Sequence, residues 1–302
     1  MARAARINPR AWLAAVPPYA WLLLFFLFPF ALVAKLSVSH TVLAIPPYAP
    51  TLDWSRGGAG LGDFIKGLSG ETYERLTRDR LYLASYLSSL RIAAISTTLL
   101  LLTGYPMAYG MARAAPRSRT LLLMAVILPF WTSFLIRIYA WIAILKPEGL
   151  LNLALGRLHL GPVEVLNTPT AVYIGVVYSY LPFMVLPLYA ALEKLDNTLL
   201  EAAADLGASP SQAFWRVTFP LSWPGVVAGS LLCFIPIVGE FVIPDLLGGP
   251  GSLMIGRTIW TEFFANRDWP SASAVAIVLL ATLVAPILIY QHQQAKALER
   301  RG

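Results

Sequence analysis

The stretch Glu201-Ala-Ala-Ala-Asp-Leu-Gly207, followed by Val217-Thr-Phe-Pro220, is a polar insert between two strongly apolar segments. Thr198 and Glu201 have the spacing of a capping box, in which an N-terminal hydroxyl and a carboxylate three residues later satisfy the first N–H groups of a helix. Glycine is the residue that most readily ends a helix in the left-handed conformation. We therefore expect a short helix that begins at Thr198 and ends at Gly207.

A second capping signal follows at once. Ser209-Pro210-Ser211-Gln212 repeats the spacing, and Pro210 occupies a first-turn position where no N–H is needed. Proline disrupts the interior of a helix, so this second helix is expected to end before Pro220. The insert, residues 196–220, is thus predicted to be two short helices joined at a glycine.

The composition is that of a membrane protein. Of 302 residues, 57% are hydrophobic and only 13% are charged, whereas a soluble domain carries about a quarter charged residues. Six apolar segments reach the roughly 20 residues needed to cross a hydrocarbon core. They are Pro17–Val38, Leu81–Met111, Thr120–Leu145, Pro169–Leu192, Ser222–Leu247 and Ser271–Tyr290. We predict an all-α integral membrane protein with six transmembrane helices that contacts the lipid bilayer directly.

Basic residues in the short flanks predict the orientation. They cluster in the N-terminal tail, in the connection between the second and third spans, and in the C-terminal tail. These three segments lie on one side of a six-span protein, and the positive-inside rule makes that side cytoplasmic. Both termini and the insert are therefore predicted to be cytoplasmic. The net charge of +7 reflects this topology, and no nucleic-acid partner is expected.

Motifs for catalysis are missing from the sequence. There is no His-Glu-x-x-His, no metal-binding Cys/His spacing and no Gly-x-Ser-x-Gly elbow. A phosphate-binding Gly-x4-Gly-Lys-Ser/Thr loop is missing too. We predict no catalytic residue, no metal site and no cofactor bound by this chain. An ion-driven secondary transporter stays open as an alternative, although no convincing internal repeat supports it.

The insert resembles the EAA loop of bacterial ABC importer permeases. The residues that fall on the family pattern are Glu201, Ala202, Ala203, Gly207, Val217, Phe219 and Pro220. The resemblance implies that the insert docks on a cytoplasmic ATPase, which binds ATP and Mg. It assigns ATPase coupling to Glu201, Ala202, Ala203, Asp205, Gly207 and Pro220. A bulky residue at Gly207 is expected to be strained and to obstruct the turn. The alternative is an ordinary polar connector.

The resemblance is narrower in the last third of the chain. Gly239–Pro250, Met254–Arg257 and Asn266–Ala274 look like the spermidine/putrescine permeases, closest to the putrescine type, and Pro129–Arg137 fits them too. This implies the type I importer fold in a bacterial inner membrane. It also implies three partners: a second homologous permease, an ATPase dimer and a soluble substrate-binding protein. Iron, opine or other amine substrates stay open.

The resemblance also suggests a division of the chain. Residues 1–80 would hold the first helix and a long periplasmic loop, residues 81–293 a five-helix permease core, and residues 294–302 a cytoplasmic tail. For the loop from 40 to 80, both a docking surface for the binding protein and a solvated linker stay open.

A polyamine pathway requires carboxylates and aromatic faces, because the substrate is a polycation. Glu240 lies inside the fifth span between two prolines, and Asp245 follows five residues later. An ionisable residue inside a membrane is expected to be functional. We assign both to the substrate path. The alternative for Glu240 is an ion pair with Arg137 or Arg91.

Arginines and aromatic residues complete the candidate set. A cation in the path would repel a polyamine, so Arg137 and Arg91 are assigned to structural ion pairs. Cation–π contacts with substrate are assigned to Trp131, Tyr139 and Tyr178. Helix packing and interfacial belts are the alternative roles of these aromatic residues.

Overall fold

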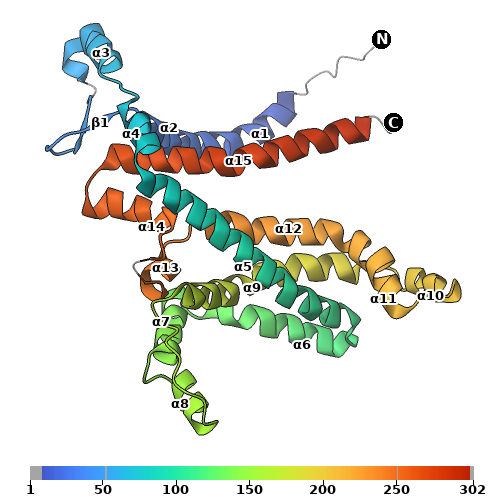
Figure 1. The fold of residues 1–302 in the computed structure, drawn as a ribbon. Coiled ribbons are helices and arrows are strands. Elements are labelled where there is room, and N and C mark those ends of the chain that lie inside the picture. The colour runs from blue at the N-terminus through green and yellow to red at the C-terminus, as the bar shows by residue number, and fades with distance from the viewer. Residues whose placement is uncertain (1–8, 52, 250, 300–302) are drawn as a thin grey trace. The chain divides into compact units, whose positions relative to one another are not determined.

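The computed structural model describes residues 9–51, 53–249 and 251–299. It is almost entirely helical, as the sequence predicts (Figure 1). The elements before residue 114 are α1 (Pro9–Leu22), the π-helix η1 (Leu23–Leu27), α2 (Phe28–Ser37), β1 (His40–Thr41), β2 (Tyr48–Ala49), η2 (Trp54–Arg56), α3 (Gly57–Lys66), α4 (Glu71–Arg78) and α5 (Arg80–Arg113).

After residue 114 every described element is a helix, and loops join these helices. The elements are α6 (Pro116–Ile127), the 3-10 helix η3 (Leu128–Trp131), α7 (Phe134–Leu145), α8 (Leu150–Arg157), α9 (Pro169–Glu193), α10 (Thr198–Asp205), α11 (Pro210–Ala213), the π-helix η4 (Phe214–Thr218), α12 (Phe219–Val238), α13 (Val242–Leu247), α14 (Ile255–Trp260), the π-helix η5 (Thr261–Ala265) and α15 (Trp269–Glu299).

The chain divides into two compact units. The described residues up to Leu83, together with those from Ile259 on, form one unit, and Ala84–Thr258 form the other. This grouping differs from the predicted boundaries at 80 and 293, because the last helix packs with the first apolar helix.

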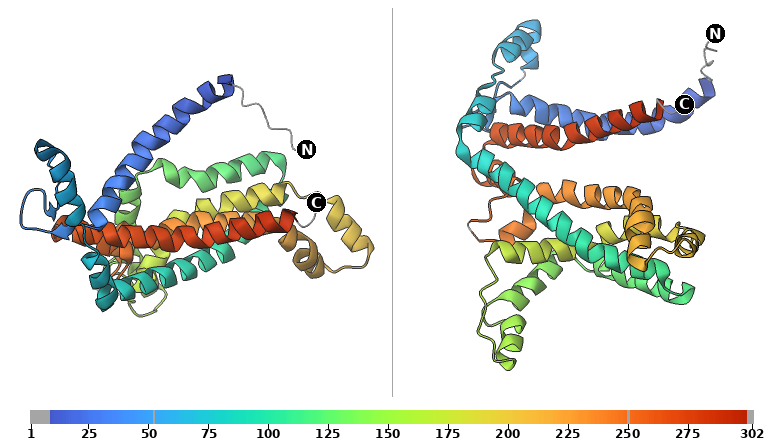
Figure 2. Two further views of the ribbon diagram at one scale, coloured as in Figure 1. Left: turned by 90° about the horizontal axis from the view of Figure 1, so that it is seen from above. Right: turned by 45° about the vertical axis from the view of Figure 1, so that its right-hand side comes forward.

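In the first unit, α2 and α15 lie side by side, and α4 packs on the beginning of α15 (Figures 1 and 2). The loop between α2 and α5 contains a two-stranded antiparallel hairpin, in which His40 pairs with Ala49. Asp268, just before α15, holds this loop. Its carboxylate accepts hydrogen bonds from Thr41 at 2.6 Å and from Arg75 at 2.7 Å. The long first loop is therefore an ordered structure tied to the last helix.

In the second unit, α9 and α12 form the central pair (Figure 1). Fully buried side chains on both helices make the core, among them Val172, Met184, Leu188 and Ile237. Gly225 permits the close approach, since a Cβ there would lie 2.6 Å from the Cβ of Ala191. Small residues at such crossings are typical of helix packing in membranes.

The number of straight spans differs from the prediction of six. Four described helices are long and apolar enough to cross a membrane, and there are five if one bent pair counts as a single span. The apolar part of α15, Trp269–Val284, is shorter.

The predicted third span is not one helix. Its two parts, Pro116–Trp131 and Phe134–Arg157, meet at 90°. Pro129 lacks the N–H that would continue α6, and the backbone of Thr132 and Ser133 is extended. The proline therefore converts the end of α6 into a short 3-10 turn, and the chain changes direction after it.

Candidate functional site

The insert has the predicted helix–glycine–helix form. α10 begins at Thr198, and Gly207 lies at φ +79°. The N–H of Ala208 bonds to the carbonyl of Ala203 at 3.0 Å, and the N–H of Gly207 bonds to that of Ala204 at 2.8 Å. This pair of bonds is a Schellman motif, which requires a left-handed residue at the position of Gly207.

The caps of the two short helices differ. At α11 the predicted capping box is present, with Ser209 and Gln212 each bonding to the other's backbone N–H. At α10 no side chain of Asn197, the N-cap residue, makes a capping bond. The Asp196 carboxylate instead accepts from the N–H of Thr198 at 2.9 Å, and this bond lowers the pKa of Asp196. The predicted Thr198–Glu201 box is thus replaced by a turn in which Asp196, two residues before Thr198, supplies the acceptor.

Pro220 does not end the second helix. The helical path runs from Pro210 to Val238, with a π-helical turn at Phe214–Thr218. In that turn the N–H of Phe219 bonds to the carbonyl of Phe214, five residues back. Pro220 then occupies the first turn of α12, where a missing N–H is tolerated. The prediction of a break before Pro220 is therefore wrong.

The outer face of the insert carries exposed apolar side chains. Leu206 is 89% exposed, Trp215 61% and Leu199 45%. Of the residues predicted to couple to the ATPase, Glu201, Ala202, Asp205 and Gly207 are exposed, and Ala203 is half-buried. Exposed apolar residues framed by carboxylates are typical of a protein contact surface.

Aromatic and polar contacts join the base of the insert to the helices of its own unit. Phe214 packs edge-on against Tyr105 at 5.6 Å and against Tyr109 at 6.0 Å between ring centroids. The hydroxyls of Tyr105 and Ser222 are 2.8 Å apart in the core. Arg113 donates to the side chain of Asn197. These contacts connect the insert directly to α5 and α12. Sequence reasoning missed this cluster, although the aromatic spacing around residue 214 was visible.

Glu240 lies in the break between α12 and α13. One carboxylate oxygen accepts from the N–H groups of Phe241 and Val242 at 3.1 and 3.0 Å, and the other accepts from the hydroxyl of Tyr180 at 2.7 Å. Neither Arg137 nor Arg91 makes an ion pair among the described residues, so that role stays a prediction for both. Glu240 is thus a cap for the broken helix and an acceptor for α9.

Asp245 has a different neighbour. Its carboxylate lies 3.1 Å from Nε of Arg257, and both side chains are partly exposed. The sequence assigns no role to Arg257, although it belongs to the Met254–Arg257 stretch, because only the fold brings it beside Asp245. This pairing neutralises the charge of Asp245 within the chain.

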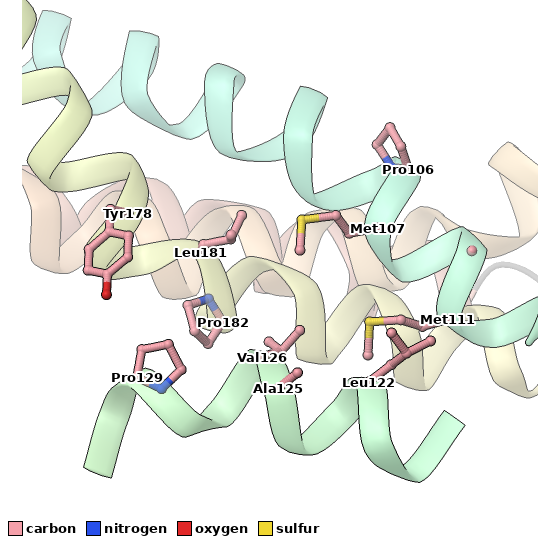
Figure 3. A pocket seen from close by; sticks show the side chains of 11 residues that line it. Pro106, Met107, Met111, Leu122, Ala125, Val126, Pro129, Tyr178, Leu181 and Pro182 are labelled. Carbon is pink, nitrogen blue, oxygen red and sulfur yellow. The ribbon is translucent and has the colours of Figure 1, made fainter. Parts of the chain in front are cut away.

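Two cavities lie in the second unit. One, of about 410 Å³, is apolar and lies between α5, α6 and α9, with Tyr178 at one end (Figure 3). The other, of about 320 Å³, is lined by Phe130, Phe134, Arg137, Ser179, Tyr180, Phe183, Leu232 and Pro236. Tyr180, which lines the second cavity, donates its hydroxyl to Glu240, and Glu240 itself is not part of the lining.

The predicted path residues do not converge in this chain. Tyr178 lines the apolar cavity and packs edge-on against Trp141. Trp131 is 84% exposed and Tyr139 57%, and neither lines one of the two cavities. Their place in a substrate path stays a prediction.

The chain is similar to known transport proteins over nearly its whole length. A family model described as "Binding-protein-dependent transport system inner membrane component" matches residues 11–297. The spermidine/putrescine transport system permease protein PotB of Haemophilus influenzae is 43% identical over 285 residues, which cover 94% of this chain and 93% of that protein. The protein of the same name from Escherichia coli K12 is 46% identical over 73% of this chain and 80% of its own length.

A solved structure shows the same fold. A chain of the crystal structure of a bacterial alginate ABC transporter, in complex with its alginate-bound periplasmic protein, superposes with a TM-score of 0.72. The match covers 98% of both chains at 18% identity. The predicted all-α fold of a type I importer permease is thereby confirmed.

Proposed function

The chain belongs to the family of binding-protein-dependent transport system inner membrane components, and from that premise we propose that it is the permease subunit of an ATP-driven polyamine importer. The observation that carries the substrate class is the 43% identity to a spermidine/putrescine permease over 94% of this chain. A second, related permease, an ATPase dimer and a substrate-binding protein complete the transporter.

The insert is the proposed docking element for the ATPase. Its exposed Leu206 and Trp215 provide apolar contact area, and Glu201 and Asp205 provide charge. ATP and Mg bind to the partner, since the sequence of this chain has no phosphate-binding loop. Closure of the ATPase dimer moves the insert, and the cluster around Phe214 passes that movement to α5 and α12.

The substrate path is proposed to involve Glu240, Asp245 and the aromatic residues Trp131, Tyr139 and Tyr178. Glu240 is the strongest of these, because a carboxylate at a break in a spanning helix is positioned to meet an ammonium group. Both termini and the insert are proposed to lie in the cytoplasm, in agreement with the basic residues of the flanks.

Uptake of labelled putrescine into proteoliposomes tests this function. The vesicle membrane contains this chain, the candidate second permease and the ATPase. The insert and ATP are inside the vesicle, and the binding protein is outside. We expect ATP-dependent uptake that spermidine competes with and that ferric iron and an opine do not. Uptake of another solute alone would show that the substrate is not a polyamine. Uptake driven by an ion gradient without ATP would show that the protein is a secondary transporter and not an ATP-driven importer.

A matched pair of variants tests the docking surface. Leu206→Asp places a charge on the exposed face of the insert and should reduce co-purification of the ATPase by roughly tenfold, as loss of an interface anchor does. Leu160→Asp makes the same change at an exposed leucine outside the insert and should have no effect. Equal co-purification of the ATPase with both variants would show that the exposed face of the insert is not part of the ATPase interface.

A further inference from the structure

The cavity of about 320 Å³ between α7, α9 and α12 combines an aromatic wall with an unmatched cation. Phe130, Phe134 and Phe183 form much of its lining. The Arg137 guanidinium carbon lies 5.2 Å from the ring centre of Phe130 and 5.8 Å from that of Phe134. The rings thus support the positive charge, but they accept none of its N–H groups in a conventional hydrogen bond.

One buried donor of Arg137 has no partner among the described residues. Its Nε is buried and has no hydrogen-bond partner, and its side chain makes no ion pair. Ser179 lines the same cavity, is 5% exposed, and also has no partner for its hydroxyl. Buried polar groups are nearly always hydrogen-bonded, so two unfilled donors in one cavity indicate an acceptor that this chain does not supply.

Two carboxylates of the same unit, Glu240 and Asp245, are already engaged. Glu240 accepts from Tyr180 and from the backbone at the beginning of α13, and Asp245 pairs with Arg257. A guanidinium binds planar oxyanions, above all carboxylates, through two parallel N–H bonds. A polyamine does not fit, because an ammonium group would be repelled by Arg137.

We propose that this cavity receives a carboxylate side chain of the second permease subunit, which pairs with Arg137 and accepts from Ser179. The inference rests on the proposed function, because that function supplies the second permease. A lone cation within an apolar span is costly, and an acidic residue from a partner that also lies in the membrane removes that cost. Arg137 then becomes an assembly residue, which makes pairing of the two permeases dependent on charge.

Arg137→Met and Arg137→Lys separate this role from the others. Methionine removes the charge and retains much of the side-chain length, and lysine keeps the charge without the planar fork. For each variant, the melting temperature of the purified full-length chain is measured alone in detergent, and capture of the second permease is measured after co-expression. Uptake of putrescine is measured on the complexes that form.

The melting temperature and the capture of the second permease should respond differently to loss of Arg137. Because Arg137 is unmatched in the single chain, Arg137→Met should leave the melting temperature unchanged or raise it. The same variant should weaken capture of the second permease by roughly tenfold to a hundredfold, since it leaves the partner's carboxylate unpaired. Arg137→Lys should retain part of the capture. A single Glu-to-Gln or Asp-to-Asn change within a span of the second permease should rescue Arg137→Met.

Three results would overturn the inference. A lower melting temperature with unchanged capture would make Arg137 a residue of this chain's own fold. Unchanged capture with altered uptake of putrescine or of a carboxylated solute would make the cavity a substrate site. If no acidic position of the second permease rescued capture, its carboxylate would not be the ligand. Failure of the unmodified chain to capture any second permease would instead refute the proposed function itself.

Discussion

Gly207 shows how one residue determines the geometry of the insert. Its φ of +79° lies in the left-handed region, and the Schellman bonds of Ala208 and Gly207 depend on that conformation. A Cβ built at Gly207 has no atom within 4 Å apart from those of its own turn, so the structure gives no support for a clash at that position. The cost of substitution is therefore conformational strain and not a clash.

Gly207→Val should destabilise the turn by about 1–2 kcal/mol and weaken coupling to the ATPase, because a β-branched residue is strained at positive φ. Gly207→Asn should be milder, since asparagine adopts this conformation more readily. Substrate-stimulated ATP hydrolysis by complexes of each variant checks the order. Equal activity of both variants and the unmodified chain would show that the turn is not part of the lever.

Glu240 combines a structural role with a proposed transport role, and two substitutions separate them. Glu240→Ala leaves the N–H groups of α13 and the Tyr180 hydroxyl without an acceptor, so it should lower the free energy of unfolding by about 1–3 kcal/mol. Glu240→Gln retains a carbonyl oxygen for the backbone and should fold nearly as well. Thermal unfolding of the purified chains measures both.

The transport role of Glu240 is tested on the glutamine variant. Loss of its negative charge should raise the apparent KM for putrescine by roughly tenfold, because a desolvated charge pair is removed. Tyr180→Phe is the matched control, since it removes the hydrogen bond and keeps the carboxylate. Unchanged uptake by Glu240→Gln would limit Glu240 to capping α13.

At the scale of elements, the insert was well predicted and its exit was not. Gly207, Ser209 and Gln212 are local signals, and each acts in the way its spacing indicates. Pro220 was misread because a π-helical turn shifts the hydrogen-bond register, which a proline alone does not reveal. The bend after Pro129 has a different local cause, because there the proline ends α6 in a 3-10 turn and the chain then changes direction.

The hydrogen bonds of Asp268 with Thr41 and Arg75, called here the strap, join the first loop to α15. The strap should be sensitive to acid. Burial by itself raises the pKa of Asp268, but hydrogen bonds from Thr41 and Ser271 and the charge of Arg75 outweigh it, so this pKa lies below its ordinary value. A carboxylate with a lowered pKa stabilises the fold above its unfolded pKa of about 4, and this contribution is lost as the pH falls through the folded value.

Asp268→Asn should therefore lower the melting temperature at pH 7 and flatten its decline in acid. The free energy of unfolding at pH 7 should fall by about 1–3 kcal/mol, the range for hydrogen bonds to a charged group. Asp63→Asn is the matched control, because the Asp63–Arg56 pair is exposed and such pairs contribute little. Parallel pH profiles for Asp268→Asn and the unmodified chain would show that the strap does not hold the first unit.

At the scale of the whole molecule, apolar segments predicted the membrane class and the helical fold. The candidate path was predicted less well. Glu240 was identified because an ionisable residue in an apolar span is unusual, but its partner Tyr180 is 60 residues away in the sequence. Trp131 in η3 and Tyr139 in α7 were chosen by residue type alone, which does not indicate that both side chains are exposed in this chain.

The orientation of the chain is testable by labelling in intact cells. Cys233, the single native cysteine, is buried and is first replaced by alanine. Ser118→Cys, in the exposed beginning of α6, should be protected from a membrane-impermeant maleimide, and Ser55→Cys, in the first loop, should be labelled. The reverse pattern would place the insert outside the cell.

The most direct test of the central claim is ATP hydrolysis by the reconstituted transporter, measured with the binding protein and putrescine, spermidine, ferric iron or no ligand. We predict stimulation by a polyamine alone, and we expect Leu206→Asp to reduce it by roughly tenfold, because less ATPase is bound to the complex. An active ATPase that never associates with this chain would contradict the assignment of the insert. Stimulation by a ligand other than a polyamine would contradict the assignment of a polyamine as the substrate.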